Sequence, residues 1–249
     1  MDRMATSERW RVAAVIPTLD EEESIGPVVS AIPRDAVDEI IVVDSGSRDR
    51  TADHARAAGA RLVATGRGYG RACHDGALAA EGCDVLVFLD GDGSDCPELI
   101  PMLLAPILAG SHDFVIGSRT RGEREAGSMS LHQVFAGHAA GAAMRLLYGV
   151  RYTDMCAFRA IRRDILMRLG MREMTYGWNL EMQMRAARMG LRILEIPVAH
   201  RRRIGGASKV AGSVSGTVKA SVRICLTLAR VALESRADTR HSASAGASR

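Results

Sequence analysis

Residues 84–98 read D-V-L-V-F-L-D-G-D-G-S-D-C-P-E. The apolar run at residues 85–89 is too short for an independent helix, and its branched and aromatic side chains are typical of a buried strand. Asp90 and Asp92 follow in a glycine-bearing loop, and Pro97 suits the first turn of a helix. Because α/β proteins bind ligands at the carboxyl ends of their strands, this stretch predicts a strand that ends in a functional, acidic loop.

The paired acids suit a metal site. Asp90 and Asp92 alternate along the backbone, so both carboxylates can face one hard cation such as Mg²⁺ or Mn²⁺. An EF-hand is excluded, because its sixth and twelfth loop positions require Gly and Glu but hold Asp95 and Pro101. Ordinary turn or helix-capping roles are the alternative. We favour a cation site that holds a nucleotide pyrophosphate.

The composition indicates one α/β domain, or one such domain with a small appendage. A chain of 249 residues with 47% hydrophobic content can bury a sizeable core. The five cysteines are scattered and odd in number, which favours neither a disulfide framework nor a zinc site and fits a reducing cytoplasm. No apolar run approaches the roughly 18 residues of a membrane span, and the first residues are too charged for a secretion signal. The protein is therefore expected to be soluble or to lie on a membrane surface.

Strand and helix patterns alternate along the chain. Strands are predicted at residues 11–16, 39–43, 61–64, 85–89, 113–117 and 191–198, with 152–158 extended. Helices are predicted after residue 18, at 52–58, from the glycine loop to 80, and at 98–108, 131–148, 164–169 and 178–189. This order predicts βαβ crossovers and a largely parallel sheet, with Asp44, the 66–71 loop, Asp90 and Asp92 on one rim.

Two further features lie on the predicted rim. The loop Gly66-x-Gly68-x-Gly70 lacks the G-x-G-x-x-G spacing of a dinucleotide site. It is either a flexible loop or one whose backbone, together with Arg71, approaches phosphates. Asp44 could cap the next helix, or its carboxylate could accept hydrogen bonds from a base or ribose.

The positive charge is concentrated late in the chain, which predicts an anionic partner for the second half. Residues 201–203 are all Arg, and Lys209 follows two glycines and a serine. This run is either a solvated turn or a phosphate clamp, and the glycines favour the clamp. Glu181 and Arg185 are spaced as a helical ion pair, but Glu181 could instead be a general base if it faces the rim.

Four ordered motifs resemble a known family: V-I-P-T-L-D-E-E-E-S-I, I-I-V-V-D-S-G-S-R-D-R-T, V-L-V-F-L-D-G-D-G-S and R-R-R-I-G-G-A-S-K-V. Over about residues 10–225 the chain looks like glycosyltransferase family 2, in the branch similar to dolichol-phosphate mannosyltransferases with a GT-A fold. The resemblance implies a domain at 1–209, and the sequence pattern adds an amphipathic, surface-binding helical segment at 210–233 and a disordered tail at 234–249. Ser45 and Ser94 depart from the paired acids and the glutamine that the family often has, so the donor stays open.

The resemblance, together with the rim pattern, gives a set of site residues. The residues expected to be catalytic are Asp92, Asp154, Glu181 and Arg119. Those expected to bind donor, metal or phosphate are Pro17, Leu19, Glu21, Asp44, Ser45, Arg71, Asp90, Gly91, Arg202, Arg203 and Lys209, with Asp90 and Asp92 as metal ligands.

The implied reaction is a metal-dependent, inverting transfer of a hexosyl unit from GDP-mannose or UDP-glucose to polyprenyl phosphate. A hydroxyl acceptor, a sugar-phosphate nucleotidyltransferase and a membrane-surface binding protein without turnover are the alternatives. The nucleotidyltransferase would need a glycine-rich, basic loop after the first strand, where this chain has P-T-L-D-E-E. We expect a cytoplasmic protein, peripheral on the inner face of the membrane and compatible with a homo-oligomer, with no nucleic-acid partner.

Overall fold

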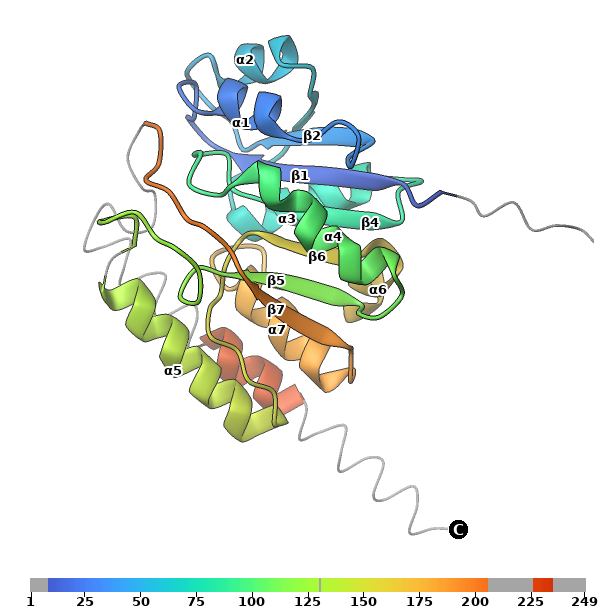
Figure 1. Cartoon of the computed structure of the whole chain (residues 1–249), viewed down its shortest axis with the longest axis vertical. Helices are drawn as coiled ribbons and strands as arrows, with labels where there is room; N and C mark the ends of the chain where they lie inside the picture. Colours follow the sequence, from blue (N-terminus) through green and yellow to red (C-terminus); the bar gives the residue numbers. More distant parts are fainter. Residues whose placement is uncertain (1–8, 130, 206–225, 235–249) are drawn as a thin grey trace, which may run out of the picture.

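The computed structural model describes residues 9–129, 131–205 and 226–234. In these residues, seven strands form one sheet in the order β3-β2-β1-β4-β6-β5-β7 (Figure 1). All neighbouring strands pair in parallel except β6, which is antiparallel to both β4 and β5. The strands are β1 (Val12–Thr18), β2 (Glu39–Asp44), β3 (Arg61–Ala64), β4 (Val85–Phe88), β5 (Phe114–Ser118), β6 (Arg159–Arg162) and β7 (Ile193–Pro197).

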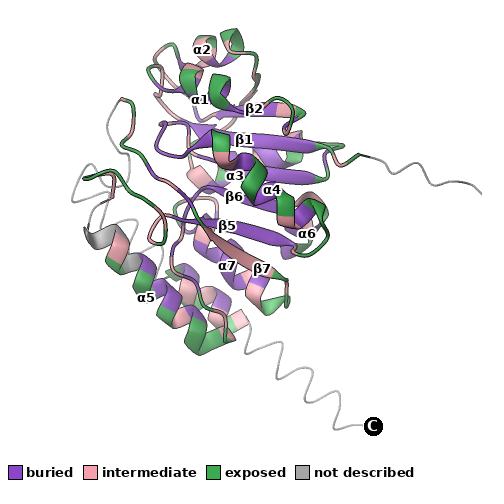
Figure 2. Ribbon diagram, in the orientation of Figure 1, coloured by how far each residue is buried: buried purple, intermediate pink, exposed green. Residues whose placement is uncertain are grey.

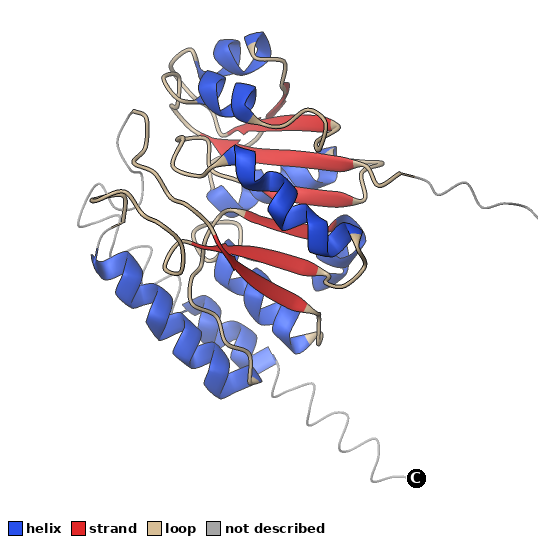
Figure 3. Cartoon of the chain, in the orientation of Figure 1, coloured by secondary structure: helices blue, strands red, loops and turns tan. Residues whose placement is uncertain are grey.

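Helices cover both faces of the sheet, as Figure 3 shows. Helices α1 and α4 lie on one face and α3 and α7 on the other, while α5 packs against α7. The helices are α1 (Ile25–Ala31), α2 (Thr51–Ala57), α3 (Tyr69–Ala79), α4 (Ile100–Leu108), α5 (Leu131–Tyr148), α6 (Arg163–Leu169) and α7 (Trp178–Arg188). A short 3-10 helix, η1 (Pro97–Leu99), precedes α4, and residues 226–234 are also helical.

The sheet forms the centre of the hydrophobic core. Every residue of β1 and β4 is buried, as the colouring of the strands in Figure 2 shows. Helix α3 approaches the sheet closely at Gly76, where an added Cβ would lie 2.4 Å from a methyl group of Val15 and 2.8 Å from one of Val43. The buried, β-branched strands therefore provide a rigid base for the loops at their carboxyl ends.

The predicted mixed α/β class with a mainly parallel sheet is confirmed, and most predicted elements agree with the structure within two residues. The expectation of an extended segment at 152–158 was wrong: these residues form a loop, and the strand follows as β6. The strand was not predicted because it contains Arg159, a charged residue that is nevertheless fully buried in β6. Its guanidinium is accommodated because it donates hydrogen bonds to the carbonyl oxygens of Cys156 and Asn179.

The helical segment predicted at 210–233 falls mostly outside the described residues, which include only its last part. That part, 226–234, is helical as expected. None of the helices described here combines the length and the low polarity needed to cross a membrane.

Candidate active site

The loops at one edge of the sheet form the candidate site. Because β1, β2, β4 and β5 run in the same direction, the segments that follow them emerge at this edge. Strand β6 runs the opposite way, so the loop before it, which contains Asp154, reaches the same edge. The structure thus brings together residues from five separate parts of the chain.

The acidic loop after β4 is held in shape by its own side chains. The Ser94 N–H and hydroxyl both donate to Asp92 Oδ1, at 2.9 and 2.6 Å. The Asp90 N–H donates to Asp95 Oδ2 at 3.0 Å. Ser94 therefore orients Asp92.

Asp90 follows β4 at the carboxyl end of the strand and is half-buried. This burial raises the pKa of the Asp90 carboxyl well above its usual range, and the nearby charges of Asp95 and Asp92 raise it further. The charged form of Asp90 is therefore disfavoured without a cation, and a cation bound beside it would stabilise that form.

Acidic residues in the loop after β1 form hydrogen bonds that join this loop to the loop after β2. The Arg48 N–H donates to Asp20 and the Arg50 N–H to Glu22, while the Glu22 N–H donates to Asp49. Asp20 has a φ of 51°, in the left-handed region that few non-glycine residues adopt. The predicted acids of the first helical turn thus precede α1 and position two loops.

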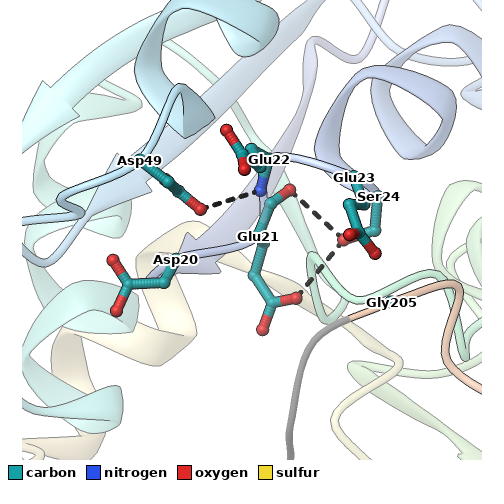
Figure 4. Close-up of a pocket in the computed structure, with 7 residues that line it drawn as sticks. All are labelled: Asp20, Glu21, Glu22, Glu23, Ser24, Asp49 and Gly205. Carbon is teal, nitrogen blue, oxygen red and sulfur yellow. Dashed lines mark hydrogen bonds between the residues drawn. The ribbon is translucent and has the colours of Figure 1, made fainter.

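These loops line a small pocket, which Figure 4 shows. Its lining residues are Asp20, Glu21, Glu22, Glu23, Ser24, Asp49 and Gly205. The Ser24 hydroxyl donates to the carbonyl oxygen of Gly91 at 2.8 Å and connects this pocket to the acidic loop. Of the other residues expected at the nucleoside, Pro17 is buried in β1, and Leu19 follows the strand half-buried.

Asp44 ends β2 and shapes the next loop. Its Oδ1 accepts hydrogen bonds from the N–H and the hydroxyl of Ser47, at 3.0 and 2.5 Å. Asp44 does not cap the following helix, which was one of its two possible roles, because the residue at the N-cap of α2 is Arg50. Ser45 is buried, and its N–H donates to the carbonyl oxygen of Thr18. A contact between Asp44 and a nucleoside stays a prediction.

Residues 200–205, which we call the C-terminal strap, run alongside the acidic loop. The N–H groups of Arg201 and Ile204 donate to the carbonyl oxygens of Ser94 and Asp92, both at 2.9 Å. The Arg203 guanidinium contacts both carboxylate oxygens of Glu21 and lies 3.9 Å from Asp92 Oδ2. The strap thus places one cationic side chain at the acids of the rim.

Neighbouring Arg202 points elsewhere, toward the loop that follows β5. Its Nε donates to the carbonyl oxygen of Ala126, and its N–H donates to Glu125. In this structure Arg203, and not Arg202, therefore approaches Asp92. Lys209 lies outside the described residues.

Arg119 and Asp154 form a bidentate ion pair at the edge of the site. Arg119 Nε and Nη2 donate to the two Asp154 oxygens at 2.8 and 2.7 Å, and the backbone N–H groups of Arg119 and Met155 add two more bonds. Burial favours a higher pKa for Asp154, but the hydrogen bonds and charge of Arg119 lower it below its usual range. This geometry opposes a role for Asp154 as the base that a hydroxyl acceptor would need, because a carboxylate with a low pKa and saturated oxygens accepts protons poorly.

Glu181 does not face the rim. Its side chain is completely buried, and it accepts hydrogen bonds from the N–H groups of Arg172 and Glu173 and from the guanidinium groups of Arg185 and Arg230. The predicted pair with Arg185 is present at 2.9 Å, although it is buried and not on the surface. Since Arg230 belongs to helix 226–234, Glu181 attaches that helix to α7, which contradicts the expectation of a general base.

The glycines before α3 have a packing role. A Cβ on Gly68 would lie 2.4 Å from the carbonyl oxygen of Met174, and one on Gly70 would lie 2.4 Å from that of Glu173. The loop therefore needs glycine to contact the backbone at 173–174, which gives a reason for these residues other than phosphate binding. Arg71 is exposed and folds back over Gly66, and its phosphate contact stays a prediction.

The donor atoms at the rim fit a hard divalent cation. Asp90 and Asp92 offer carboxylate oxygens, which Mg²⁺ and Mn²⁺ prefer. A positive group, the Arg203 guanidinium, already lies 3.9 Å from Asp92. In the described part of the chain, no three His, Cys, Asp or Glu side chains form a complete metal cage. A cation held here would thus take its remaining ligands from a nucleotide diphosphate or from water.

Three residues that support the site were not predicted: Ser24, Asp95 and His200. The His200 side chain is buried, and its Nδ1 lies 3.8 Å from Asp95 Oδ1 without a hydrogen bond to any described residue. The contact between residues 95 and 200 depends on tertiary packing, so the local sequence does not indicate it. The adjacent arginines are the one sequence signal in this part of the chain.

Comparison with known proteins identifies the family. The family model described as glycosyl transferase family 2 matches residues 13–170. The chain belongs to glycosyltransferase family 2. An uncharacterized glycosyltransferase of Mycobacterium tuberculosis is 37% identical, and the match covers 83% of this chain and 93% of that protein. An undecaprenyl-phosphate mannosyltransferase of Micrococcus luteus is 35% identical, over 85% and 92% of the two chains.

A solved structure of this architecture is similar over most of the chain. It is glucosyl-3-phosphoglycerate synthase from Mycobacterium tuberculosis in complex with Mn²⁺, uridine diphosphate and glucosyl-3-phosphoglycerate, with a TM-score of 0.71 and 26% identity. The match covers 90% of this chain and 80% of that chain. The GT-A fold expected for this family 2 glycosyltransferase is therefore confirmed, and the nucleotidyltransferase alternative is displaced.

Proposed function

We propose that this family 2 glycosyltransferase moves a hexosyl unit, mannose or glucose, from a nucleotide-sugar to a polyprenyl phosphate, with Mg²⁺ or Mn²⁺ as cofactor. Asp90 and Asp92 would hold the cation, and Glu21 and Asp44 would lie toward the nucleoside. The relative from Micrococcus luteus, named as an undecaprenyl-phosphate mannosyltransferase, supports the acceptor class. The Mn²⁺ and uridine diphosphate in the similar solved structure support a metal-bound nucleotide.

The observation that carries the choice of a phosphate acceptor is the engagement of Asp154 and Glu181. Three hydrogen bonds from Arg119 and one from Met155 occupy Asp154, and four donors surround the buried Glu181. A hydroxyl acceptor would need one of these acids as a base. A phosphate oxygen is already anionic near neutral pH and can attack without one.

In this proposal, the acceptor oxygen attacks the anomeric carbon, the bond from that carbon to the diphosphate breaks, and the configuration inverts. When bound, the cation neutralises charge on the leaving diphosphate. Arg203 contacts the diphosphate, since arginine binds phosphate oxygens in a bidentate manner. Arg202 and Lys209 orient the acceptor phosphate, and Arg119 keeps the loop before β6 at the rim through Asp154.

The proposal includes where the protein acts. Residues 1–209 form the transferase domain, and the segment 210–233 with its basic neighbours contacts the inner face of the membrane, where a lipid phosphate resides. The protein is then cytoplasmic and peripheral.

A second candidate is transfer to a small phosphorylated acceptor with a free hydroxyl. The similarity to a glucosyl-3-phosphoglycerate synthase favours it. It predicts turnover in water with a phosphoglycerate and no requirement for a lipid.

Equilibrium binding tests the donor site. We expect GDP-mannose or UDP-glucose to bind in isothermal titration calorimetry only when Mn²⁺ is present. The Asp92→Asn variant should bind the donor about tenfold more weakly or weaker still, because substitutions around a metal site typically reduce affinity by this factor. Asp53→Asn, on the exposed surface of α2, removes one charge away from the site and should bind as the wild type does. Donor binding that ignores Mn²⁺, or that Asp92→Asn leaves intact, would contradict the proposal.

A further inference from the structure

The position of Arg203 points to a role beyond phosphate binding. Two main-chain hydrogen bonds attach the C-terminal strap to the acidic loop, from Arg201 to Ser94 and from Ile204 to Asp92. The Ile204 side chain packs over Gly93, where an added Cβ would lie 2.5 Å from Ile204 Cδ1. These contacts hold the strap backbone beside the acids independently of the charge of the Arg203 side chain.

The Arg203 side chain lies among the acids of the rim. Its Nη2 is 2.9 and 3.1 Å from the two Glu21 oxygens and 3.9 Å from Asp92 Oδ2. Its Nε donates to the carbonyl oxygen of Gly205 at 2.7 Å. The side chains of Arg203, Glu21 and Asp92 are 23%, 10% and 21% exposed, so solvent screens this contact only in part.

The carboxylates near Arg203 favour a cation at this site. Asp92 and Asp95 lie in the acidic loop and Glu21 lies beside it, and like charges at short range repel one another. The Arg203 guanidinium compensates part of this charge. A divalent cation held by Asp92 would compensate the same charge, and it would repel a guanidinium at this distance.

We propose that Arg203 is the resident counter-cation of the metal site. This inference rests on the proposed function. The Arg203 guanidinium pairs with Glu21 and Asp92 when no donor is bound, and a divalent cation bound there would displace it. The displaced guanidinium then binds an anionic oxygen of the donor diphosphate. The Arg203 side chain would have to move and give up its bond to the Gly205 carbonyl oxygen, while the main-chain bonds from Arg201 and Ile204 to the acidic loop remain.

The inference predicts two effects of opposite sign. Removing the Arg203 charge removes a competitor of the metal, so Mn²⁺ alone should bind more tightly. The same change removes a phosphate contact, so the nucleotide should bind more weakly once Mn²⁺ is saturating. A residue with only a structural role, or one that only binds phosphate, would not strengthen the binding of Mn²⁺.

The test compares Arg203→Met with Arg201→Met. Methionine keeps an apolar stem without the charge, and Arg201 pairs with Glu98 on the exposed side of the strap. Free Mn²⁺ is measured by electron paramagnetic resonance without nucleotide, and binding of GDP and UDP is measured by calorimetry at saturating Mn²⁺. For Arg203→Met we expect the Kd of Mn²⁺ to fall by about fivefold, a typical coupling between sites. The Kd of the nucleotide should rise about tenfold, as expected for a lost charged hydrogen bond. Arg201→Met should change neither.

A measurement on the unmodified protein covers the case in which Arg203→Met does not fold. The ¹⁵N resonance of Arg203 Nε should shift during a titration with Mg²⁺ alone, with the same midpoint as Mg²⁺ binding. Two results would overturn the inference alone, provided that the wild type still binds metal and nucleotide. One is a Mn²⁺ affinity that is unchanged or weaker in a folded Arg203→Met variant. The other is an Nε resonance that does not shift when Mg²⁺ is added. A wild-type protein that binds neither would overturn the proposed function as well.

Discussion

Replacing Glu181 by Ala should destabilise the protein and spare its chemistry. The substitution removes a carboxylate that four donors surround at 2.6 to 3.1 Å. Two backbone N–H groups, which lie beside a side chain with no exposed surface, lose their acceptor. Two guanidinium groups lose part of their counter-charge at the same time. The loss is therefore larger than that of one surface ion pair.

The magnitude follows from the exposure of the partners. Breaking a buried ion pair typically costs about 3–5 kcal/mol. Arg230 is 37% exposed and Arg185 keeps a second partner in Glu234, so solvent and that partner recover part of the loss. We expect the free energy of unfolding to fall by about 3 kcal/mol, at the low end of that range. For a domain of this size, the midpoint of thermal unfolding should then fall by about 6–12 °C.

The matched control is Glu234→Ala, which removes another carboxylate from the same network. The Glu234 side chain is 26% exposed, and it pairs with Arg172 and Arg185. Its removal should cost only about 0–1 kcal/mol, as partly exposed pairs do.

Urea unfolding followed by circular dichroism measures both stabilities, and turnover is compared at a temperature where both variants are folded. Glu181→Ala should retain the turnover of its folded fraction. A loss of about 10²–10⁴ in kcat, the usual effect of removing a general base, with an unchanged unfolding midpoint would refute our interpretation of Glu181.

Three other variants test the packing and the ion pairs. Gly70→Ala should lower the free energy of unfolding by about 2 kcal/mol, because its Cβ meets backbone at 2.4 Å. Gly26→Ala in α1, whose Cβ has nothing within 4 Å, should raise it by about 0.5 kcal/mol, and equal effects in urea titrations would contradict this contrast. The bonds from Arg192 lower the pKa of Asp113, so this carboxylate stabilises the fold above its unfolded pKa of about 4 and stops doing so as the pH falls through its folded pKa. Asp113→Asn should therefore be less stable than the wild type at pH 7 and equally stable in acid, and a difference that persists in acid would argue against this role. Asp154→Asn, which leaves the half-buried Arg119 beside a neutral amide, should lower the free energy of unfolding by about 3 kcal/mol, and an unchanged melting temperature would disprove the importance of that pair.

The strands that form the rim were predictable because short runs of apolar residues in the local sequence indicate their burial. Strand β3 has the predicted bounds, and β4 ends one residue earlier than predicted. Short apolar runs followed by Gly, Asp or Ser give a clear local signal. The same signal predicted that Asp44, Asp90 and Asp92 lie at one edge of the sheet.

Strand β6 and the glycine loop show where local sequence fails. The strand Arg159–Arg162 begins and ends with arginine, and its buried member is accommodated by carbonyl groups of a loop and of α7. The glycines at 68 and 70 contact a backbone segment about a hundred residues later in the chain. Both features depend on contacts between distant parts of the chain, which composition and spacing do not encode.

The roles of the charged residues were only partly predictable for the same reason. Spacing predicted the pair of Glu181 with Arg185, but its burial depends on helix 226–234 packing against α7. Likewise, the arginine run predicted a cationic segment near phosphate, and only the alternation of side chains along the strap separates Arg203 from Arg202.

Transfer of the hexosyl unit to a lipid phosphate tests the proposed function most directly. Purified protein with Mn²⁺ is given radiolabelled GDP-mannose or UDP-glucose and either a polyprenyl phosphate in detergent or 3-phosphoglycerate, and the label is partitioned between organic solvent and water. Our account predicts that one donor labels the lipid phosphate and that Asp92→Asn abolishes this labelling. Label that moves only to phosphoglycerate, or lipid labelling that persists in Asp92→Asn, would contradict it.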